Sequence, residues 1–336
     1  MSKTGFLKKI LNFTEIIAVN LIVLLAILVI FEISLRLFWK MSTPQGDLYT
    51  NSSDHILRYE LKPNASNGLV SINSDGFRDK DFQLAKDKGV FRIVVIGDSE
   101  TFGKSLPLKD TISKKLEAAL NSRCKKSSFE VLNMGVEGYN TIQELEFLKN
   151  KGLKYNPDLV ILYYCFNDTD YPEYYFKKNF INDNFLVARY IQYRIKKGMV
   201  KRDRKKRNIN SEEGVFAYLY SHDSWEYTKK AIKTISELTK SNNIKFMVMV
   251  VPEVSSAVKD FREGYPYWYI NEMLDNFLKS QDIDFIEPIH LFSEQNLNPL
   301  DMVVSFEDRH KNGLANSLIA EQLGDELFKR GMISCQ

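Results

Sequence analysis

The sequence of 336 residues predicts an α/β fold, a doubly wound parallel sheet of five strands preceded by one apolar N-terminal helix. An apolar run fills most of the first forty residues, and beyond residue 90 short apolar segments alternate with segments of helical periodicity. Apolar residues make up 44% and charged residues 26% of the chain, an ordinary globular mixture. This composition excludes a disordered tail protein, a collagen-like chain and a polytopic membrane protein.

The apolar run predicts a membrane anchor over residues 15–39. Fifteen of the sixteen residues from 16 to 31 are apolar, and Asn20 is the exception. About 24 helical residues span about 36 Å, enough for a hydrocarbon core about 30 Å thick. A cleaved signal peptide is the alternative, but no small-x-small cleavage site follows the run. We therefore expect an uncleaved anchor that contacts the membrane.

The charges beside the run predict its orientation. Three lysines precede it and two basic residues follow it, which favours a cytoplasmic tail over residues 1–14 and an extracytoplasmic domain, periplasmic or on the outer face. The net charge of +3 is contained in residues 1–40, where five basic residues meet two acidic ones. The rest of the chain is balanced, so we expect no nucleic-acid partner.

The remaining elements follow in chain order. Residues 40–90 are polar and rich in turn signals, which predicts a linker and an N-terminal extension, with a possible short strand at 69–72. The main domain is expected over 91–332. Its strands are expected at 91–96, 129–132, 158–164, 244–251 and 283–286. Its helices are expected at 109–120, 141–153, 225–238, 267–278 and 313–328.

A long insert follows the third strand of this domain. Residues 165–221 show no clear alternation and are expected to be irregular. Within them, residues 194–207 carry nine basic side chains and one acidic one. The simplest interpretation is a solvated, partly disordered loop. The alternative is that this basic run docks anionic headgroups or an acidic glycan.

Polar motifs come after three of the strands and before the last helix. They are Gly97-Asp98-Ser99, the segment from Asn133 to Gly138, Asn167-Asp168, and Asp308-Arg309-His310. Ligand sites of doubly wound sheets lie at the carboxyl ends of the strands, so we expect these motifs to meet in one crevice.

The residue types in these motifs are those of acyl transfer. A serine becomes nucleophilic when an imidazole takes its proton, and a carboxylate fixes the tautomer of that imidazole. Ser99, His310 and Asp308 can supply these groups. A tetrahedral oxyanion also needs preset donors. The backbone N–H groups of Ser99 and Gly138 and the amide of Asn167 can supply three.

These four blocks resemble the SGNH, or GDSL-like, superfamily of esterases and acyltransferases, and specifically a bacterial membrane-anchored branch, over about residues 91–330. The resemblance implies a flavodoxin-like sheet and a Ser-Gly-Asn-His tetrad. It places the nucleophile on Ser99, the oxyanion glycine on Gly138 in preference to Gly135, and the oxyanion asparagine on Asn167. The base falls on His310. The orienting acid falls on Asp308, and a Ser-His-Asp mechanism is implied.

The sequence departs from the family pattern at three positions. Glu100 follows the nucleophile in place of an apolar residue, and we expect its carboxylate to face outward. Cys165 stands where the third block usually has glycine. Many family members have Asp-x-x-His, and position 307 here is glutamate. Glu307 is therefore a second candidate for the orienting acid.

Three functions remain open at this stage. The first is a membrane-anchored extracytoplasmic serine esterase that removes O-acyl groups, chiefly O-acetyl, from a surface glycan or a small ester. The second is an O-acyltransferase for a cell-envelope polysaccharide, supplied by a multi-span acyl-donor partner. The third is a non-catalytic glycan-binding module. No cofactor or metal is expected, because the three cysteines lack metal spacing, and their pairing is left open.

Overall fold

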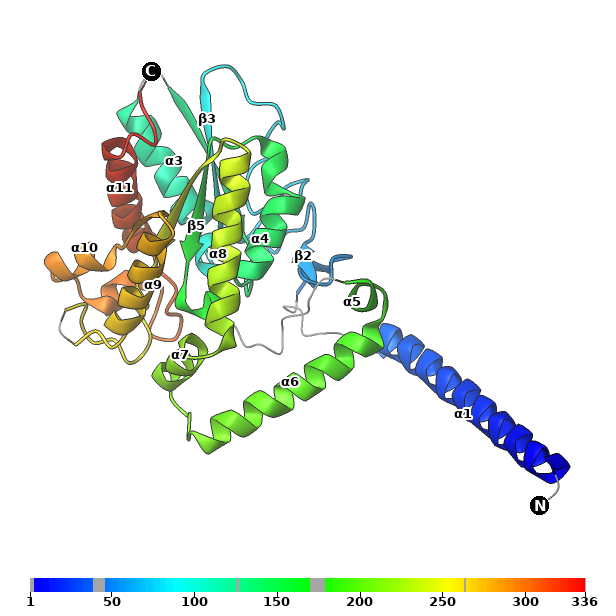
Figure 1. Cartoon of the computed structure of the whole chain (residues 1–336). Helices are drawn as coiled ribbons and strands as arrows, with labels where there is room; N and C mark the ends of the chain where they lie inside the picture. The colour runs from blue at the N-terminus through cyan, green and yellow to red at the C-terminus, as the bar shows by residue number, and fades with distance from the viewer. Residues whose placement is uncertain (1–2, 39–45, 125–126, 170–178, 263, 336) are drawn as a thin grey trace. The chain divides into compact units, whose positions relative to one another are not determined.

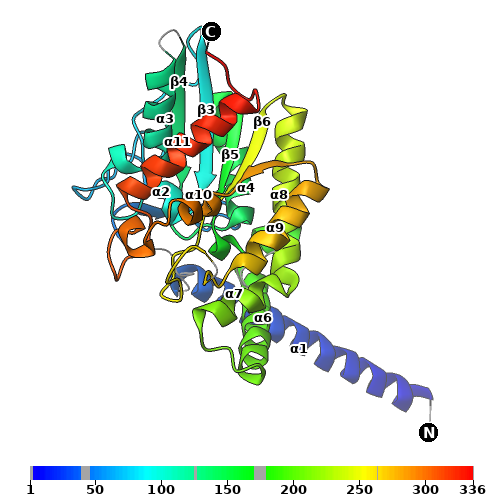
Figure 2. The same cartoon turned by 90° about the vertical axis from the view of Figure 1, so that its left-hand side faces the viewer.

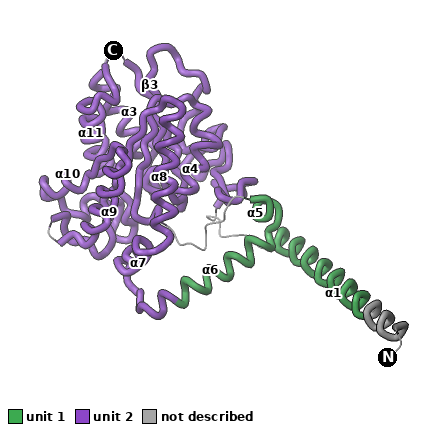
Figure 3. The backbone as a smooth tube through the Cα atoms, in the orientation of Figure 1, with its two compact units in different colours: residues 1–43, 173–202 green, residues 44–172, 203–336 purple. Residues whose placement is uncertain are grey.

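The structure, a computed structural model, describes residues 3–38, 46–124, 127–169, 179–262 and 264–335. Parts of the expected tail, anchor end, linker and insert, namely residues 1–2, 39–45 and 170–178, lie outside the described residues. The chain divides into two compact units (Figure 3). The first comprises residues 1–43 and 173–202, and the second comprises residues 44–172 and 203–336.

The first unit is helical. Helix α1 covers Lys3–Phe38, α5 covers Phe180–Asn184, and α6, Leu186–Lys206, begins in this unit. The segment Phe13–Phe38 of α1 contains an 18-residue window with a mean hydropathy of 3.0, and it is long and apolar enough to cross a membrane. A retained anchor and a signal sequence share these two properties.

The second unit is built on a parallel five-stranded sheet in the order β4-β3-β5-β6-β7. The strands are β3 Val90–Gly97, β4 Ser128–Gly135, β5 Leu159–Tyr164, β6 Lys245–Val250 and β7 Asp284–Ile286. Counted along the chain, this order is 2-1-3-4-5, the flavodoxin-like arrangement, and it confirms the predicted fold class. The switch point lies between β3 and β5, where the chain leaves in opposite directions.

Helices cover both faces of the sheet (Figures 1 and 2). Helices α3 and α11 pack together on one face, and α4 and α8 pack together on the other. The helices are α2 Ser99–Phe102, α3 Ile112–Arg123, α4 Thr141–Asn150, α7 Glu212–Tyr220, α8 Asp223–Ser241, α9 Trp268–Ser280, α10 Ile289–Glu294 and α11 Gly313–Lys329. Short 3-10 turns cover Leu108–Asp110, Gly152–Tyr155, Phe166–Asp168 and Pro299–Met302.

Strand β4 is longer than the sequence pattern predicts. Asn133 and Gly135 lack strand propensity, yet they pair in register with Val95 and Gly97 of β3. Gly135 is required here by packing, because a Cβ at this position would lie 2.1 Å from the backbone nitrogen of Phe102. The close approach brings α2 down onto the end of β4.

The N-terminal extension contains a short antiparallel pair of strands, at a different place from the possible strand at 69–72. Strands β1, Tyr49–Asn51, and β2, Tyr59–Leu61, pair antiparallel. Residues 69–72 are not a strand, since only Ser71 forms an isolated bridge, with Ser66. The surrounding asparagines and glycine favour turns over an extended ladder.

The insert is also more regular than expected, because it contains α5, α6 and α7. The basic run 194–207 is therefore helical through Lys206, and the expectation of an irregular loop is wrong. Lysine and arginine are good helix formers, and cations near a helix C-terminus interact favourably with the helix dipole.

One disulfide closes the second unit. Cys124, after α3, bonds to Cys335, near the C-terminus, and Cys165 is a buried free thiol. The bond joins positions 211 residues apart, and it resolves the pairing that the sequence left open.

Candidate active site

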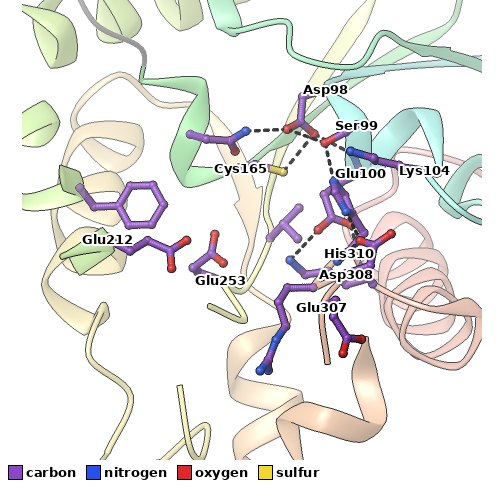
Figure 4. Close-up of a pocket in the computed structure, with 15 residues that line it drawn as sticks. Asp98, Ser99, Glu100, Lys104, Cys165, Glu212, Glu253, Glu307, Asp308 and His310 are labelled. Atoms are coloured by element: carbon purple, nitrogen blue, oxygen red, sulfur yellow. Dashed lines mark hydrogen bonds and ion pairs between the residues drawn. The ribbon is translucent and has the colours of Figure 1, made fainter. Parts of the chain in front are cut away.

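A pocket of about 510 Å³ opens at the carboxyl ends of the strands. Figure 4 shows the side chains that face it. The lining residues come from the loops after β3, β5 and β6, from α7, and from the segment before α11: Asp98, Ser99, Glu100, Lys104, Cys165, Asn167, Glu212, Phe216, Val251, Glu253, Glu307, Asp308, Arg309, His310 and Lys311. Three of the four predicted blocks therefore meet here.

Ser99 is presented by a tight turn at the end of β3. Asp98 caps α2, and its Oδ1 accepts a hydrogen bond of 2.9 Å from the backbone N–H of Glu100. The four-residue helix then ends at Gly103, which has a φ of +80° that favours glycine. The buried cap and the glycine exit together fix the backbone on both sides of Ser99.

A continuous hydrogen-bonded chain links Ser99 to two side chains before α11. The Oγ of Ser99 lies 2.8 Å from Nε2 of His310, and Nδ1 of His310 lies 2.5 Å from Oδ1 of Asp308. The other carboxylate oxygen of Asp308 accepts a 2.6 Å hydrogen bond from the hydroxyl of Ser105. Partial burial opposes ionisation of Asp308, but the hydrogen bonds from Ser105 and His310 outweigh it and lower the pKa of this carboxyl.

Glu307 does not take part in this chain. Its carboxylate accepts a 3.1 Å hydrogen bond from Ser305, and its side chain is exposed at the pocket rim. Of the two acids considered, Asp308 is the one bonded to His310 in the structure.

Asn167 lies beside the serine, after β5. Its amide nitrogen donates a 2.9 Å hydrogen bond to Oδ2 of Asp98, which orients the amide. An amide NH₂ carries two donors, so one N–H of Asn167 remains for a further acceptor. Asp98 thus holds two parts of the site, the turn of Ser99 and the side chain of Asn167.

Gly138 is not among the described residues that line this pocket. It lies in the loop after β4 with a φ of +74°, and a Cβ there would lie 2.9 Å from the hydroxyl of Tyr59. That hydroxyl donates to the backbone oxygen of Glu137 at 2.6 Å, so β2 of the extension packs on the loop. The structure gives Gly138 a clear reason to be glycine, and its role as an oxyanion donor stays a prediction.

Glu100 does not face outward, contrary to expectation. Its carboxylate forms an ion pair of 2.9 Å with Nζ of Lys311 and accepts a 3.0 Å hydrogen bond from the Lys311 backbone N–H. The two side chains are 10% and 4% exposed. Because Lys311 supplies both a charge and a backbone donor at this point, the carboxylate is satisfied inside the protein. The pair joins the residue after Ser99 to the residue after His310.

The wall of the pocket opposite the serine was not predicted from the sequence. Glu212 and Glu253 lie on that side in Figure 4, and Phe216 also lines the pocket. Burial raises the pKa of Glu253 to about 7, although the charge of Lys311 opposes the shift. Position was the signal available for Glu253, because it follows β6 at the carboxyl edge of the sheet.

Comparisons with known proteins give similarity to solved structures only. No model of a known protein family matches the sequence, and no curated protein matches it. The chain is similar to a lipolytic protein of the G-D-S-L family from Desulfitobacterium hafniense DCB-2, with 16% identity, a TM-score of 0.42, and coverage of 70% of this chain and 98% of that one. It is similar to the lipase/acylhydrolase from Enterococcus faecalis (16% identity, TM-score 0.43, coverage 73% and 98%). It is also similar to the acetyl xylan esterase AlAXEase (13% identity, TM-score 0.42, coverage 70% and 100%).

Proposed function

We propose that this protein is a serine esterase of SGNH type in which Ser99 is the nucleophile, His310 the general base and Asp308 the orienting acid. The observation that carries the proposal is the hydrogen-bonded chain from Ser99 through His310 to Asp308 at the wall of a pocket. These distances are within the reach that proton transfer requires.

The mechanism follows from this geometry. As the Oγ of Ser99 attacks the ester carbonyl, His310 takes its proton at Nε2, and Asp308 stabilises the resulting imidazolium through Nδ1–H. The carbonyl oxygen becomes an oxyanion and accepts hydrogen bonds from the Ser99 backbone N–H and the Asn167 amide, with Gly138 as a further donor. Loss of one such donor typically raises the barrier by about 3 kcal/mol.

The tetrahedral intermediate then collapses. The bond to the alcohol oxygen breaks, and His310 returns its proton to that oxygen. Water next attacks the acyl-serine, giving its proton to His310, and the second intermediate releases the acid and restores Ser99. Each step uses water, these side chains and the backbone donors named above.

The proposed substrate is an O-acylated, most simply O-acetylated, surface glycan. The aromatic face of Phe216 and the carboxylates of Glu212 and Glu253 offer stacking and hydrogen-bond acceptors, which suit a sugar carrying several hydroxyl groups. A pocket of about 510 Å³ accommodates a small acyl group together with part of its sugar.

We further propose that residues 15–39 of α1 anchor the chain in a membrane, with the N-terminus cytoplasmic and the esterase unit extracytoplasmic. The Cys124–Cys335 disulfide supports this side, since disulfides persist in oxidising compartments. Protease added to intact spheroplasts should degrade the esterase unit, whereas cleavage only after lysis would place it in the cytoplasm.

The function is tested with the full chain in detergent. A fluorophosphonate should label Ser99, and Ser99→Ala should reduce hydrolysis of a short-chain aryl ester by at least about 10³-fold. Ser122→Ala, at an exposed serine on α3, is the matched control and should retain full activity. Label on another residue, or activity of Ser99→Ala within tenfold of the wild type, would remove Ser99 as nucleophile. Adding a sugar acceptor to the assay distinguishes hydrolysis from acyl transfer.

A further inference from the structure

Helix α6 exposes an apolar stripe. Ile191, Ile195 and Met199 follow one another at four-residue intervals, so they lie on one face of the helix. They are 47%, 58% and 67% exposed. A helix of a soluble domain normally turns such a stripe toward a core, but the described part of the chain leaves this one uncovered.

Cations accompany the stripe. The segment from Leu186 to Arg202 contains six basic residues and no acidic one. Arg194, Lys197 and Lys201 are among those that are exposed. A helix of low overall hydrophobicity that combines an apolar stripe with a cationic polar side is typical of helices that lie in the interface of an anionic bilayer.

The start of α6 is fastened to the end of α1 within the same unit. Glu32 of α1 accepts hydrogen bonds from the backbone N–H groups of Leu186, at 3.0 Å, and Val187, at 2.7 Å. These are orphan donors of the first turn of α6, so Glu32 caps that helix from α1. Arg36 donates to Glu32 at 2.8 Å and to the backbone oxygen of Asn184 at 2.9 Å.

Packing extends this junction. The rings of Phe31 and Tyr190 meet edge to face with centroids 5.6 Å apart, and Leu35 is only 6% exposed while most of its neighbours on α1 are open. Helix α5, just before α6, adds two further open apolar residues: Phe180 is 73% exposed and Ile181 is 57% exposed. Both helices beside this junction, α1 and α5, therefore expose apolar side chains.

We propose that Leu186–Arg202 of α6 is an interfacial helix that lies on an anionic bilayer, with Ile191, Ile195 and Met199 inserted below the headgroups. The proposal rests on the anchoring role of α1. The Glu32–Arg36 pair sits near the end of the apolar span, where charged groups reach the headgroups, and α6 begins at that level. In this position the basic side chains of α6 contact lipid phosphates, and the apolar stripe is removed from water.

Two other partners could contact this surface of α6, an acidic glycan or a second copy of the helix, and both fit it less well. An acidic glycan would pair with the cations but leave the apolar stripe in water. A second copy of α6 would cover the stripe but would bring two clusters of six positive charges together. The bilayer alone satisfies both features, and α1 already places it beside the first turn of the helix.

The experiment uses the full chain in proteoliposomes, with a nitroxide attached at Ile195→Cys or Met199→Cys. The native cysteines form a disulfide or are buried, so only the added thiol is labelled under native conditions. Collisions with oxygen should exceed those with a water-soluble nickel chelate at both positions. A label at Glu321→Cys, an exposed position on α11, is the control and should show the opposite preference. Preference for the nickel chelate at positions 195 and 199 would overturn the proposal.

The second part of the experiment varies the charge of the lipids. In vesicles with 30% anionic lipid, we expect deeper immersion than in zwitterionic vesicles. The triple variant Lys197→Ser, Lys201→Ser, Arg202→Ser should lose this difference, since three cations contribute about 100-fold to surface affinity. Spin–spin broadening between labels would instead show that a second copy of α6 covers the stripe. Immersion that does not depend on lipid charge would refute the role proposed for the basic residues. Aryl-ester hydrolysis is measured in the same vesicles: activity with a water-exposed label refutes only the interfacial helix, and an immersed label without activity refutes only the esterase.

Discussion

Replacing Lys311 with methionine should destabilise the protein by about 3–5 kcal/mol, because it leaves Glu100 buried without its partner. In the native structure the Glu100 carboxylate receives two bonds from Lys311, the 2.9 Å ion pair and the 3.0 Å backbone bond. Only the ion pair is lost in the variant. Because the Glu100 side chain is only 10% exposed, water can replace the lysine ammonium only in part. The cost in unfolding free energy therefore stays near the value for buried charges and above that for surface pairs.

The double variant Glu100→Leu, Lys311→Met separates folding from catalysis. Removing both charges together leaves an apolar contact and a Lys311 backbone N–H without its acceptor, so stability should return to within about 1–3 kcal/mol of the wild type. The link between the residue after Ser99 and the residue after His310 is nevertheless gone. We therefore expect kcat on an aryl ester to fall by about 10- to 100-fold with little change in KM, because the distance from Oγ to Nε2 is no longer held.

Urea unfolding of the wild type, the single variants Glu100→Leu and Lys311→Met, and the double variant in detergent, followed by tryptophan fluorescence, gives the coupling energy between the two residues. A cost below about 1 kcal/mol for Lys311→Met would show that the pair is effectively solvated. A double variant that is stable and retains full kcat would show that the pair supports folding alone and does not position the serine and the histidine.

Three further predictions concern groups around the site and the disulfide. Asp308→Asn should lower kcat by about 10³- to 10⁴-fold, and Glu307→Gln by less than about threefold; the reverse order in steady-state kinetics would move the orienting acid to Glu307. The raised pKa of Glu253, about 7 against 4.5 for the ordinary group, gives a stability contribution that is complete below pH 4.5 and lost as pH rises to 7. Glu253→Gln should remove this slope, at most about 3 kcal/mol, from pH-dependent unfolding curves, and an unchanged slope would assign it elsewhere. Replacing Cys124 and Cys335 with serine should cost about 3–5 kcal/mol in urea unfolding, given the 211-residue separation, and an unchanged midpoint would refute this estimate.

The fold could be predicted because its signals are local. The inner strands β3, β5 and β6 are largely buried on both faces and appear as short apolar runs, and the helices between strands carry apolar stripes of their own. The meeting of Ser99, Asn167 and His310 followed from topology alone, because strand ends and the segment before the last helix share one edge of such a sheet.

Contacts that neither the local sequence nor the order of the strands determines could not be predicted. Glu100 was expected to face outward because an inward carboxylate would repel the developing oxyanion, but its charge is balanced by Lys311, which lies 211 positions away. The same applies to the disulfide, where three cysteines left the pairing undecided. Glu253 shows a further limit: its place after β6 was available, but the burial that raises its pKa depends on packing against other parts of the unit.

Helix α6 shows how a dominant signal can hide a weaker one. In the sequence, nine basic residues in the run 194–207 suggest a solvated loop, and the apolar positions between them look incidental. Once the backbone is helical, Ile191, Ile195 and Met199 become one stripe, and its exposure requires an explanation. The cap from Glu32 supplies one, because it ties the helix to the segment with the strongest membrane signal in the chain. The same contact favours a retained anchor over a cleaved signal peptide, since cleavage after the apolar run would remove the residue that caps α6.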